Sequence, residues 1–259
     1  MLNQTQNISS DHGIEQFKIF KRYRALVHGF STRKGGESKP PFDQLNLGFN
    51  TPDSRTVVQT NRELYFDALE VSEDLLAFPE QVHSSNIQIA RGPGVFKKTD
   101  ALVTNLENLF LTVQTADCFP VFIFDPVKKA VGLVHSGWRG TAQNITGKTI
   151  DIMRNAFNSH PENLLIAIGP GVQQNCYQVD DDTASNFSPD FLIADGPGHH
   201  KLDVQKAIIS QIIQKGVSGK NLEINTACTH CAKDRYFSYR RDRDKSGRMM
   251  GVIGLKNRT

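Results

Sequence analysis

Apolar and polar positions along the central part of the chain, residues 111–141, predict two strands joined by a turn. Apolar runs at 121–124 and 130–134 flank Asp125-Pro126-Val127-Lys128, a segment with the composition of an ordinary hairpin loop. The second run leads through a glycine-rich turn into a helix that we expect to begin at about Thr141. The pattern therefore predicts a hairpin, a tight turn and a helix at the centre of the fold.

The length of the hairpin loop decides which residues face one another. If Phe124 pairs with Lys129, Cys118 lies directly opposite His135, and directly opposed residues have Cβ atoms roughly 5 Å apart. If the loop has two residues, Cys118 faces Gly137 instead, and His135 becomes its diagonal neighbour. Both registers keep the thiol and the imidazole close enough to share one metal ion or one proton.

Elsewhere, apolar residues recur at helical spacing in three segments. Asp53 has the position of an N-cap for the first, the second runs from Ile145 and stops before Pro161, and the third runs from its N-cap Asp203 to Gly216. Short apolar runs predict strands at residues 25–30, 75–78, 86–90, 100–104, 164–168, 222–227 and 249–255.

Many of these strands are apolar at consecutive positions, so we expect both faces of the sheets to be covered. Strands and helices are interspersed without a strict βαβ order. The pattern therefore predicts a mixed α/β, or α+β, layered fold in a single domain. The N-terminus is polar, and we expect a flexible tail over residues 1–16 before a single catalytic domain of residues 17–259.

The composition is that of a globular protein and narrows the class of partner. Among 259 residues, 30 Lys and Arg stand against 27 Asp and Glu, a balance that does not indicate nucleic-acid binding. No apolar stretch has the length of a membrane-spanning helix, and the N-terminus lacks the apolar core of a signal peptide. We therefore expect a cytoplasmic protein with reduced thiols and with neither nucleic-acid nor membrane partners.

Cys118 and His135 are the strongest candidates for chemistry, because the hairpin brings them together. A buried thiol beside a hydrogen-bonded core histidine explains the pair equally well. Two neighbours favour a functional site: Asp117 places a charge at a strand end, and Arg139 lies in the glycine-rich turn, where free backbone N–H groups suit an anion. A plain turn with a surface arginine is the alternative there. His83, taken alone, is typical of a surface loop.

The other cysteines and the arginine-rich segment are weaker candidates. Cys228-Thr229-His230-Cys231 has the spacing of two metal ligands, but a structural zinc needs four, so we favour core thiols at a strand end. Cys176 is expected to be a buried thiol. The basic segment at 235–248 is interpreted as a solvated loop whose arginines pair with Asp242 and Asp244.

Short motifs spread along the chain carry a family resemblance. Gln81-Val82-His83, Thr115-Ala116-Asp117-Cys118 and Val134-His135-Ser136-Gly137-Trp138-Arg139-Gly140 resemble the three motifs of the laccase-domain family, also called the YfiH family. Further matches are Gly29-Phe30-Ser31-Thr32-Arg33 with Gly35-Gly36, Leu45-Asn46-Leu47-Gly48, Ile168-Gly169-Pro170, and Tyr239-Arg240-Arg241-Asp242 with Gly247-Arg248. The resemblance extends from about residue 25 to the C-terminus, and the motifs are specific in combination.

The resemblance implies a laccase-domain fold related to cysteine-hydrolase-like toxins, with a catalytic zinc ion bound by His83, Cys118 and His135. It also implies phosphorolysis of adenosine, inosine, guanosine and methylthioadenosine, and deamination of adenosine. Copper-dependent phenol oxidation and peptidoglycan precursor editing are also described for this family. We therefore expect zinc, or alternatively copper, as the cofactor, purine nucleosides and phosphate as small-molecule partners, and a monomer or homodimer.

The residue types agree with this chemistry, since one thiolate and two imidazoles leave a fourth position of a catalytic zinc free for water. We expect Arg139, Arg33 and Asn46 to bind the substrate, with the two arginines as candidates for holding phosphate. The chain departs from the family at Ser84, where glycine is frequent, and at residues 49–53, where a Gly-Asp pair is common. The contribution of residues 49–53 to the site is therefore open.

Three other interpretations use the same residues. A metal-free hydrolase or amidase acting on peptidoglycan precursors would have Cys118 as nucleophile and His135 as base. A copper phenol oxidase would bind its metal through His83 and the same pair. A non-catalytic partner protein would keep the site as a relic. The metal content of protein purified without added metal separates the zinc enzyme from the metal-free hydrolase.

Overall fold

The computed structural model describes residues 3–4 and 13–257, and in these residues the strands form three sheets. The seven-stranded sheet has the order β1 (Asn3–Gln4), β15 (Leu222–Ile224), β11 (Leu165–Ile168), β9 (Phe119–Asp125), β10 (Ala130–Ser136), β7 (Ala101–Thr104) and β5 (Ile87–Ile89). The six-stranded sheet has the order β2 (Ile14–Glu15), β3 (Leu26–Ser31), β16 (Met249–Leu255), β8 (Phe110–Thr115), β4 (Leu76–Pro79) and β6 (Gly94–Phe96). A small antiparallel sheet contains β12 (Gln178–Asp180), β14 (His199–Leu202) and β13 (Leu192–Ala194).

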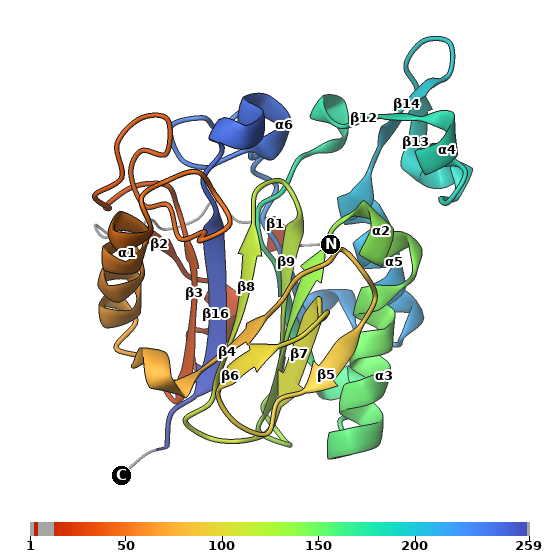
Figure 1. Ribbon diagram of the computed structural model, residues 1–259. Coiled ribbons are helices and arrows are strands. Elements are labelled where there is room, and N and C mark those ends of the chain that lie inside the picture. Colours follow the sequence, from red (N-terminus) through yellow and green to blue (C-terminus); the bar gives the residue numbers. More distant parts are fainter. Residues whose placement is uncertain (1–2, 5–12, 258–259) are drawn as a thin grey trace.

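The two large sheets form the central layers, and helices cover their outer faces (Figure 1). On the six-stranded sheet lies α1 (Arg55–Ala68), and on the seven-stranded sheet lie α3 (Ile145–Phe157) and α5 (Val204–Gln214). The short helices are α2 (Trp138–Ala142), α4 (Asp181–Ala184) and α6 (Tyr239–Asp242). The predicted mixed α/β fold in a single domain is confirmed.

Strands that are apolar at consecutive positions serve two cores at once. In β9, Val121 packs in the core beneath α3 and α5, while Phe122 enters the core between the two large sheets. In β16, Ile253 faces the same central core and Val252 faces the cluster beneath α1. Every residue of β9, β10 and β16 is buried, which explains why these strands lack polar alternation.

The central hairpin forms in the second of the two registers expected: Phe124 pairs with Val131, two residues beyond Lys129. Asp125 pairs with Ala130 across a turn of residues 126–129. The predicted pairing of Phe124 with Lys129 is wrong, because the Asp125 side chain accepts hydrogen bonds from the backbone N–H groups that open the turn. The turn therefore begins after Asp125 and not before it.

This register moves Cys118 away from the position directly opposite His135. His135 pairs with Pro120, so that Cys118, just before β9, faces Gly137 and lies diagonal to the histidine. A Cβ added to Gly137 would lie 2.9 Å from the sulfur of Cys118, which is closer than such contacts tolerate. Glycine at this position therefore leaves the space that the thiol occupies.

The sequence predicted the first residues and N-caps of the helices correctly only in part. Asp203 caps α5, as predicted, by accepting a hydrogen bond from a backbone N–H group in its first turn. The N-cap of α1 is Ser54 instead of Asp53, whose carboxylate is held by the loop before the helix. Trp138, and not Thr141, begins α2, since the chain turns immediately at the end of β10. Among the described helices, none is both long and apolar enough to cross a bilayer.

The N-terminal residues that the structure describes are paired. Asn3–Gln4 run parallel to β15, and Ile14–Glu15 pair with β3. Glu15 is buried and accepts a hydrogen bond from the Tyr236 hydroxyl at 2.5 Å. The flexible tail predicted for residues 1–16 is therefore wrong where it includes β2, because a buried carboxylate anchors that strand. Residues 1–2 and 5–12 of that tail lie outside the described residues.

Candidate functional site

The three side chains that the sequence singled out come together at one end of the central strands. His83 lies in the loop between β4 and β5, Cys118 lies just before β9, and His135 is near the end of β10. Their ligand atoms all lie within 4.8 Å of one another. The two imidazole rings meet edge to face, with centroids 4.9 Å apart. His135 is buried, Cys118 half-buried and His83 exposed, so the group is reachable from solvent on one side.

Asp100, which directly precedes β7, holds this arrangement in place. Its buried carboxylate accepts hydrogen bonds from the backbone N–H groups of Val82, His83 and Ser84, at 2.7–3.2 Å. It also accepts the Ser84 hydroxyl at 2.7 Å and lies 2.9 Å from Nδ1 of His135. One carboxylate therefore fixes both the loop that carries His83 and the ring of His135, leaving Nε2 of that ring for the thiol.

Two backbone conformations in the site are unfavourable for their residues and are held by side-chain contacts. His83 has φ +59° and Asp117 has φ +89°. Asp100 fixes the first through the backbone hydrogen bonds around His83. The Asp117 carboxylate accepts the Thr229 hydroxyl and the backbone N–H of Arg240, both at 2.6 Å. Left-handed backbone outside glycine costs of order 1–3 kcal/mol. These hydrogen bonds offset that cost and keep the backbone in the conformation that directs the ligand side chains toward one another.

The thiol and the imidazole stabilise each other as a charged pair. Burial raises the pKa of Cys118, but the charge of His135 and hydrogen bonds from both histidines lower it to about 6. Burial lowers the pKa of His135, while the Cys118 thiolate and Asp100 raise it, with a net rise to about 9. Burial likewise raises the pKa of Asp100, but the hydrogen bonds from His135 and Ser84 bring it down to about 2.

The donor set fits a soft or borderline metal ion. The low pKa of Cys118 favours its thiolate near neutral pH. Metal-binding histidines usually donate their other ring nitrogen to a carboxylate, as His135 does to Asp100. Zinc and copper both accept one thiolate and two imidazoles. His83, Cys118 and His135 can therefore hold such an ion, with one direction left open toward solvent.

Aromatic and arginine side chains surround the open side. Trp138, Tyr177 and Arg240 line a shallow cavity of about 360 Å³. The Arg240 guanidinium lies 5.6 Å from the centre of the Tyr177 ring. Burial raises the pKa of Tyr177, and the charge of Cys118 raises it further, which places this ring near the thiol. None of the three candidate ligands lines this cavity, and Tyr177 is the lining residue on which the charge of Cys118 acts.

Two further arginines stack on aromatic rings in this region. Arg139 lies 4.4 Å from the centre of the Trp138 ring, and Arg248 lies 5.7 Å from that of Tyr239. Burial lowers the pKa of Arg248, and the Cys118 thiolate is the charge that most opposes this lowering. Positive charge is thus available on the open side of the site.

Comparison with known proteins decides the family. The chain matches the model of the family described as multi-copper polyphenol oxidoreductase laccase over residues 27–256. It belongs to this laccase family. A relative named purine nucleoside phosphorylase YlmD, from Bacillus subtilis, is 31% identical over 249 residues, covering 90% of each chain. The corresponding Geobacillus stearothermophilus protein is 33% identical over 251 residues, covering 90% of this chain and 92% of that one.

Solved structures of laccase-family relatives share the whole fold. The crystal structure of YlmD from Geobacillus stearothermophilus has a TM-score of 0.91 and 31% identity, covering 97% of this chain and 99% of that one. The Bacillus licheniformis hypothetical protein YfiH has a TM-score of 0.89 and 32% identity, covering 95% and 97%. The predicted resemblance to the laccase-domain family is therefore confirmed.

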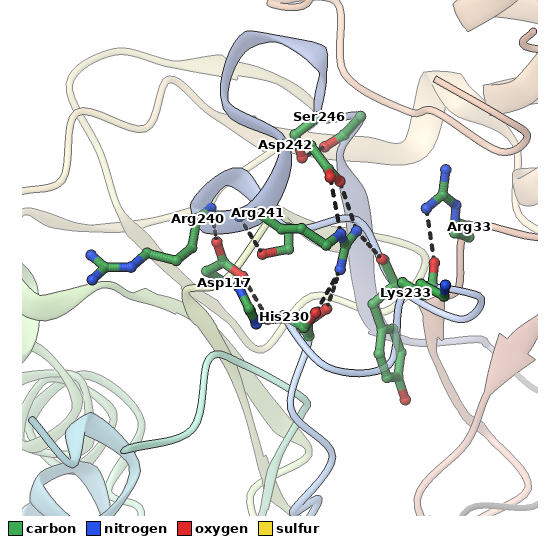
Figure 2. Close-up of polar contacts among 12 residues, drawn as sticks. Arg33, Asp117, His230, Lys233, Arg240, Arg241, Asp242 and Ser246 are labelled. Carbon is green, nitrogen blue, oxygen red and sulfur yellow. Dashed lines mark hydrogen bonds and ion pairs between the residues drawn. The ribbon is translucent and has the colours of Figure 1, made fainter. Parts of the chain in front are cut away.

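Two of the residues expected to bind substrate have structural roles in this member of the laccase family. Arg33 donates to the backbone carbonyls of Asp43 and Lys233, at 2.7 and 2.8 Å, and lies over the Phe237 ring. In Figure 2 it is separated from Arg240 by the segment that carries Arg241. The guanidinium is thus engaged within the protein and lines a different cavity, of about 420 Å³, so the phosphate contact expected of Arg33 stays a prediction.

Asn46 is fully buried, and its amide group is used within the protein. It donates to Thr51 and Asp53 and accepts from the backbone N–H groups of Gly48 and Arg248. Because the side chain is buried, the contact with substrate expected of it stays a prediction. Asn46 instead fixes the backbone of Arg248 and ties residues 49–53 to the C-terminal segment.

Sequence reasoning missed four residues of the site: Asp100, Tyr177, Arg240 and Arg248. Asp100 was visible as an acid at the start of an apolar strand, a position where a buried charge needs partners. The two arginines lie in the basic segment 235–248, which was interpreted as a solvated loop. That interpretation is wrong for part of the segment, because the Arg241 side chain, which pairs with Asp242 as expected, is only 19% exposed.

Proposed function

We propose that this protein is a zinc-dependent purine nucleoside phosphorylase whose metal ligands and catalytic residues are His83, Cys118 and His135. The observation that carries the proposal is the convergence of these three side chains, with Asp100 fixing His135 and the loop of His83. A cavity lined by aromatic rings and by Arg240 lies in the same region. The relatives named purine nucleoside phosphorylase support the choice of substrate. The free cysteines agree with a reducing, cytoplasmic location.

Phosphorolysis moves a ribosyl group from a purine nitrogen to a phosphate oxygen, and the departing base takes the bond electrons and a proton. A zinc ion in this site would supply a Lewis acid for a leaving group or a bound water. Trp138 and Tyr177 offer flat apolar faces for the purine. Arg139 offers a guanidinium for phosphate, and Asp100 keeps His135 in one orientation throughout.

We extend the proposal to cleavage of methylthioadenosine and to deamination of adenosine, which follow from the family resemblance. Deamination replaces phosphate by water as the attacking molecule, so it requires the same metal ligands but not the phosphate contact. The two reactions therefore separate the roles of His83, Cys118 and His135 from that of Arg139.

A copper phenol oxidase is the second candidate. The family description favours it, and one thiolate with two imidazoles is also the donor set of copper electron-transfer sites. Metal analysis of protein purified without added metal separates the two candidates. About one zinc at this site supports the phosphorylase. Copper occupancy, with dye oxidation that zinc does not restore, would favour the oxidase.

The decisive activity experiment incubates the protein with adenosine, inosine, guanosine or methylthioadenosine, with and without phosphate, and identifies products by mass spectrometry. We expect free base and the sugar 1-phosphate only when phosphate is present. Cys118→Ala should abolish both this reaction and zinc binding at the site. His160→Ala is the matched control, because His160 is an exposed histidine paired with Glu162. Release of base without phosphate dependence would contradict the proposal.

Arg139→Lys tests the phosphate contact. Lysine keeps the charge but loses the planar fork of donors, and a charge-assisted hydrogen bond contributes roughly 1.5–3 kcal/mol. We expect phosphorolysis to fall about 10- to 100-fold, with a raised KM for phosphate, while deamination suffers less and zinc stays bound. Arg154→Lys, an exposed arginine on α3, is the control. Equal losses in both reactions, or an unchanged KM for phosphate, would show that the turn at Arg139 is structural.

A further inference from the structure

A second group of metal-ligating side chains lies outside the proposed catalytic centre. Cys176, at the end of the short 3-10 helix Gln174–Cys176, meets the loop that contains Cys228, His230 and Cys231. The sulfur atoms of Cys176 and Cys231 are 3.2 Å apart, and a ring nitrogen of His230 lies within 4.8 Å of both. Cys228 lies on the same loop, outside this group of three, and its sulfur accepts the backbone N–H of Gln173 at 3.4 Å.

We propose that Cys176, Cys228, His230 and Cys231 form a second metal site, which binds a structural zinc ion through three thiolates and one imidazole. This donor set is one of the three usual sets of structural zinc sites. Cys228 and Cys231 have the two-residue spacing at which one loop places two thiolates on the same ion. The objection that this motif lacks partner ligands no longer holds, because the fold brings Cys176 to it from 52 residues earlier in the chain.

The distance between the sulfur atoms of Cys176 and Cys231 suits two ligands of one metal ion. Two thiolates on a tetrahedral zinc, each about 2.3 Å from the metal, are about 3.8 Å apart. A disulfide bond would need the sulfur atoms at about 2.05 Å. The observed 3.2 Å between Cys176 and Cys231 lies closer to the metal-bound value. Cys231 is exposed, so an ion can enter from solvent. Cys176 and Cys228 are only half-buried, so the expectation that these thiols are buried core residues is wrong.

The backbone of the loop is already held in position. The Thr229 N–H donates to the carbonyl of Gly171 at 3.1 Å. Figure 2 shows the Arg241 guanidinium donating to the carbonyls of Thr229 and His230, at 2.9 and 3.0 Å, while it also pairs with Asp242. These contacts fix the direction of the side chains between Cys228 and Cys231 without using any of their ligand atoms.

An ion at this site would also join two segments that border the catalytic centre, a consequence that rests on the proposed function. Cys176 directly precedes Tyr177 of the cavity. Thr229, inside the metal-binding loop, donates its hydroxyl to Asp117, which directly precedes Cys118 and also accepts the backbone N–H of Arg240 (Figure 2). The second ion therefore positions the cavity wall without contacting the substrate.

Zinc counting on variants tests the site without reference to activity. The protein is stripped with a chelator, incubated with zinc chloride under reducing conditions, desalted and analysed for metal. Cys118→Ala combined with His135→Ala removes the first centre, and we expect it to retain about one zinc per chain. Cys176→Ser combined with Cys231→Ser should lose one zinc relative to the unaltered protein. His160→Ala should lose none.

Zinc absent from the Cys118→Ala, His135→Ala protein would overturn the proposal, and so would full zinc occupancy after Cys176 and Cys231 are both replaced. Because zinc is counted directly, these results stand whether or not nucleosides prove to be substrates. Circular dichroism checks that each variant is folded, and His230→Ala, which leaves all three thiols, provides a milder change that should weaken zinc binding at least tenfold.

Cobalt chloride and cysteine alkylation give two independent readouts. Thiolate-to-cobalt absorption grows with the number of thiolate ligands, so it should fall more when the second site is removed than when Cys118 is replaced. Added zinc should protect Cys176 and Cys231 from iodoacetamide in the protein that lacks the first centre. A Cys176–Cys231 disulfide found by mass spectrometry, together with no zinc uptake by the reduced protein, would show a redox pair and overturn the metal site.

Discussion

The two groups of side chains that we propose to bind metal differ in what holds them. In the first, His135 belongs to a fully buried strand, and Asp100 fixes both this histidine and the loop of His83. In the second, the thiols lie on two loops that meet at the surface, and Cys231 is exposed. The first group is thus organised by the core, and the second by contacts between loops.

The difference separates two uses of a metal ion. A site whose ligands are fixed by buried hydrogen bonds keeps its geometry when the metal leaves, which suits an open catalytic position. A site whose ligands lie near the surface, on segments held by contacts such as those of Arg241, gains further order from the ion, which suits a structural role. Removal of metal should therefore loosen the loop between Cys228 and Cys231 more than the surroundings of His135, and hydrogen exchange would measure this.

The largest effect is expected from Asp100→Asn, which removes the support of the first group. The amide cannot accept all the N–H donors that now converge on the carboxylate, so buried donors lose their partner. We expect a loss of roughly 3–5 kcal/mol in the free energy of unfolding. Zinc affinity at His83, Cys118 and His135 should fall about 10- to 100-fold. Urea denaturation and zinc titration measure the two effects.

Asp125→Asn is the matched control, since it also changes a buried aspartate of the seven-stranded sheet. One carboxylate oxygen of Asp125 accepts two backbone N–H groups, and the other lacks a hydrogen-bond partner among the described residues. The amide can therefore replace it at little cost. If the two variants lose the same stability, or if zinc binding is unaffected by Asp100→Asn, the support assigned to Asp100 is wrong.

The decrease in the free energy of unfolding at low pH should also depend on Asp100. Its folded-state pKa of about 2 lies below the ordinary 3.8, so its hydrogen bonds stabilise the fold fully above about pH 4. That contribution is lost as the pH falls through 2, because the unfolded chain then binds the proton more readily. The metal-free Asp100→Asn protein should show a flatter loss of stability between pH 4 and 2. A slope equal to that of the unaltered protein would contradict this.

A smaller effect concerns the reactivity of Cys118 in the metal-free protein. Only the thiolate reacts with iodoacetamide, and the folded-state pKa of about 6 keeps it ionised well below the ordinary value of 9.0. The alkylation rate of Cys118 should therefore reach half its maximum near pH 6. His135→Ala removes the largest lowering influence and should raise this midpoint by at least one pH unit, which is about 1.4 kcal/mol. An unchanged midpoint would exclude the charged pair.

The sequence predicted the parts of this molecule that depend on local pattern. β16 was placed within the interval expected, and the hairpin that brings Cys118 near His135 followed from two apolar runs and a turn. The register was open because two loop lengths fit the same residues, and the hydrogen bonds of Asp125 decide between them. Consecutive buried residues in β9 gave no alternation from which to fix the register.

Contacts between residues far apart in the sequence could not be predicted from local pattern. Asp100 resembles any acid at a strand start until the loop around His83 folds onto it. Cys176 meets Cys231 only because a loop after β11 passes beside the C-terminal segment. The two-residue strand β2 has no pattern of its own, and its order comes from pairing with β3 and from the buried Glu15. In each case the partner, not the local sequence, determines the structure.

The smallest effect is expected from Arg241→Lys, which weakens the support of the second group. The guanidinium donates to the carbonyls of Thr229, His230 and Tyr236 and forms two bonds with the Asp242 carboxylate. A single ammonium group keeps the charge but cannot reach these acceptors together. None of the ligand atoms is touched. We expect zinc affinity at the second site to fall about three- to tenfold.

The same variant should leave zinc affinity at the first centre unchanged, because Asp100, and not Arg241, holds His83 and His135 there. Titrations in the Cys118→Ala background and in the Cys176→Ser, Cys231→Ser background measure each site separately. Arg154→Lys on the exposed face of α3 controls for a general effect of exchanging arginine. An equal fall at both sites would mean that the two groups share one support, and no fall at either would mean that the loop of Cys228 holds its shape without the guanidinium.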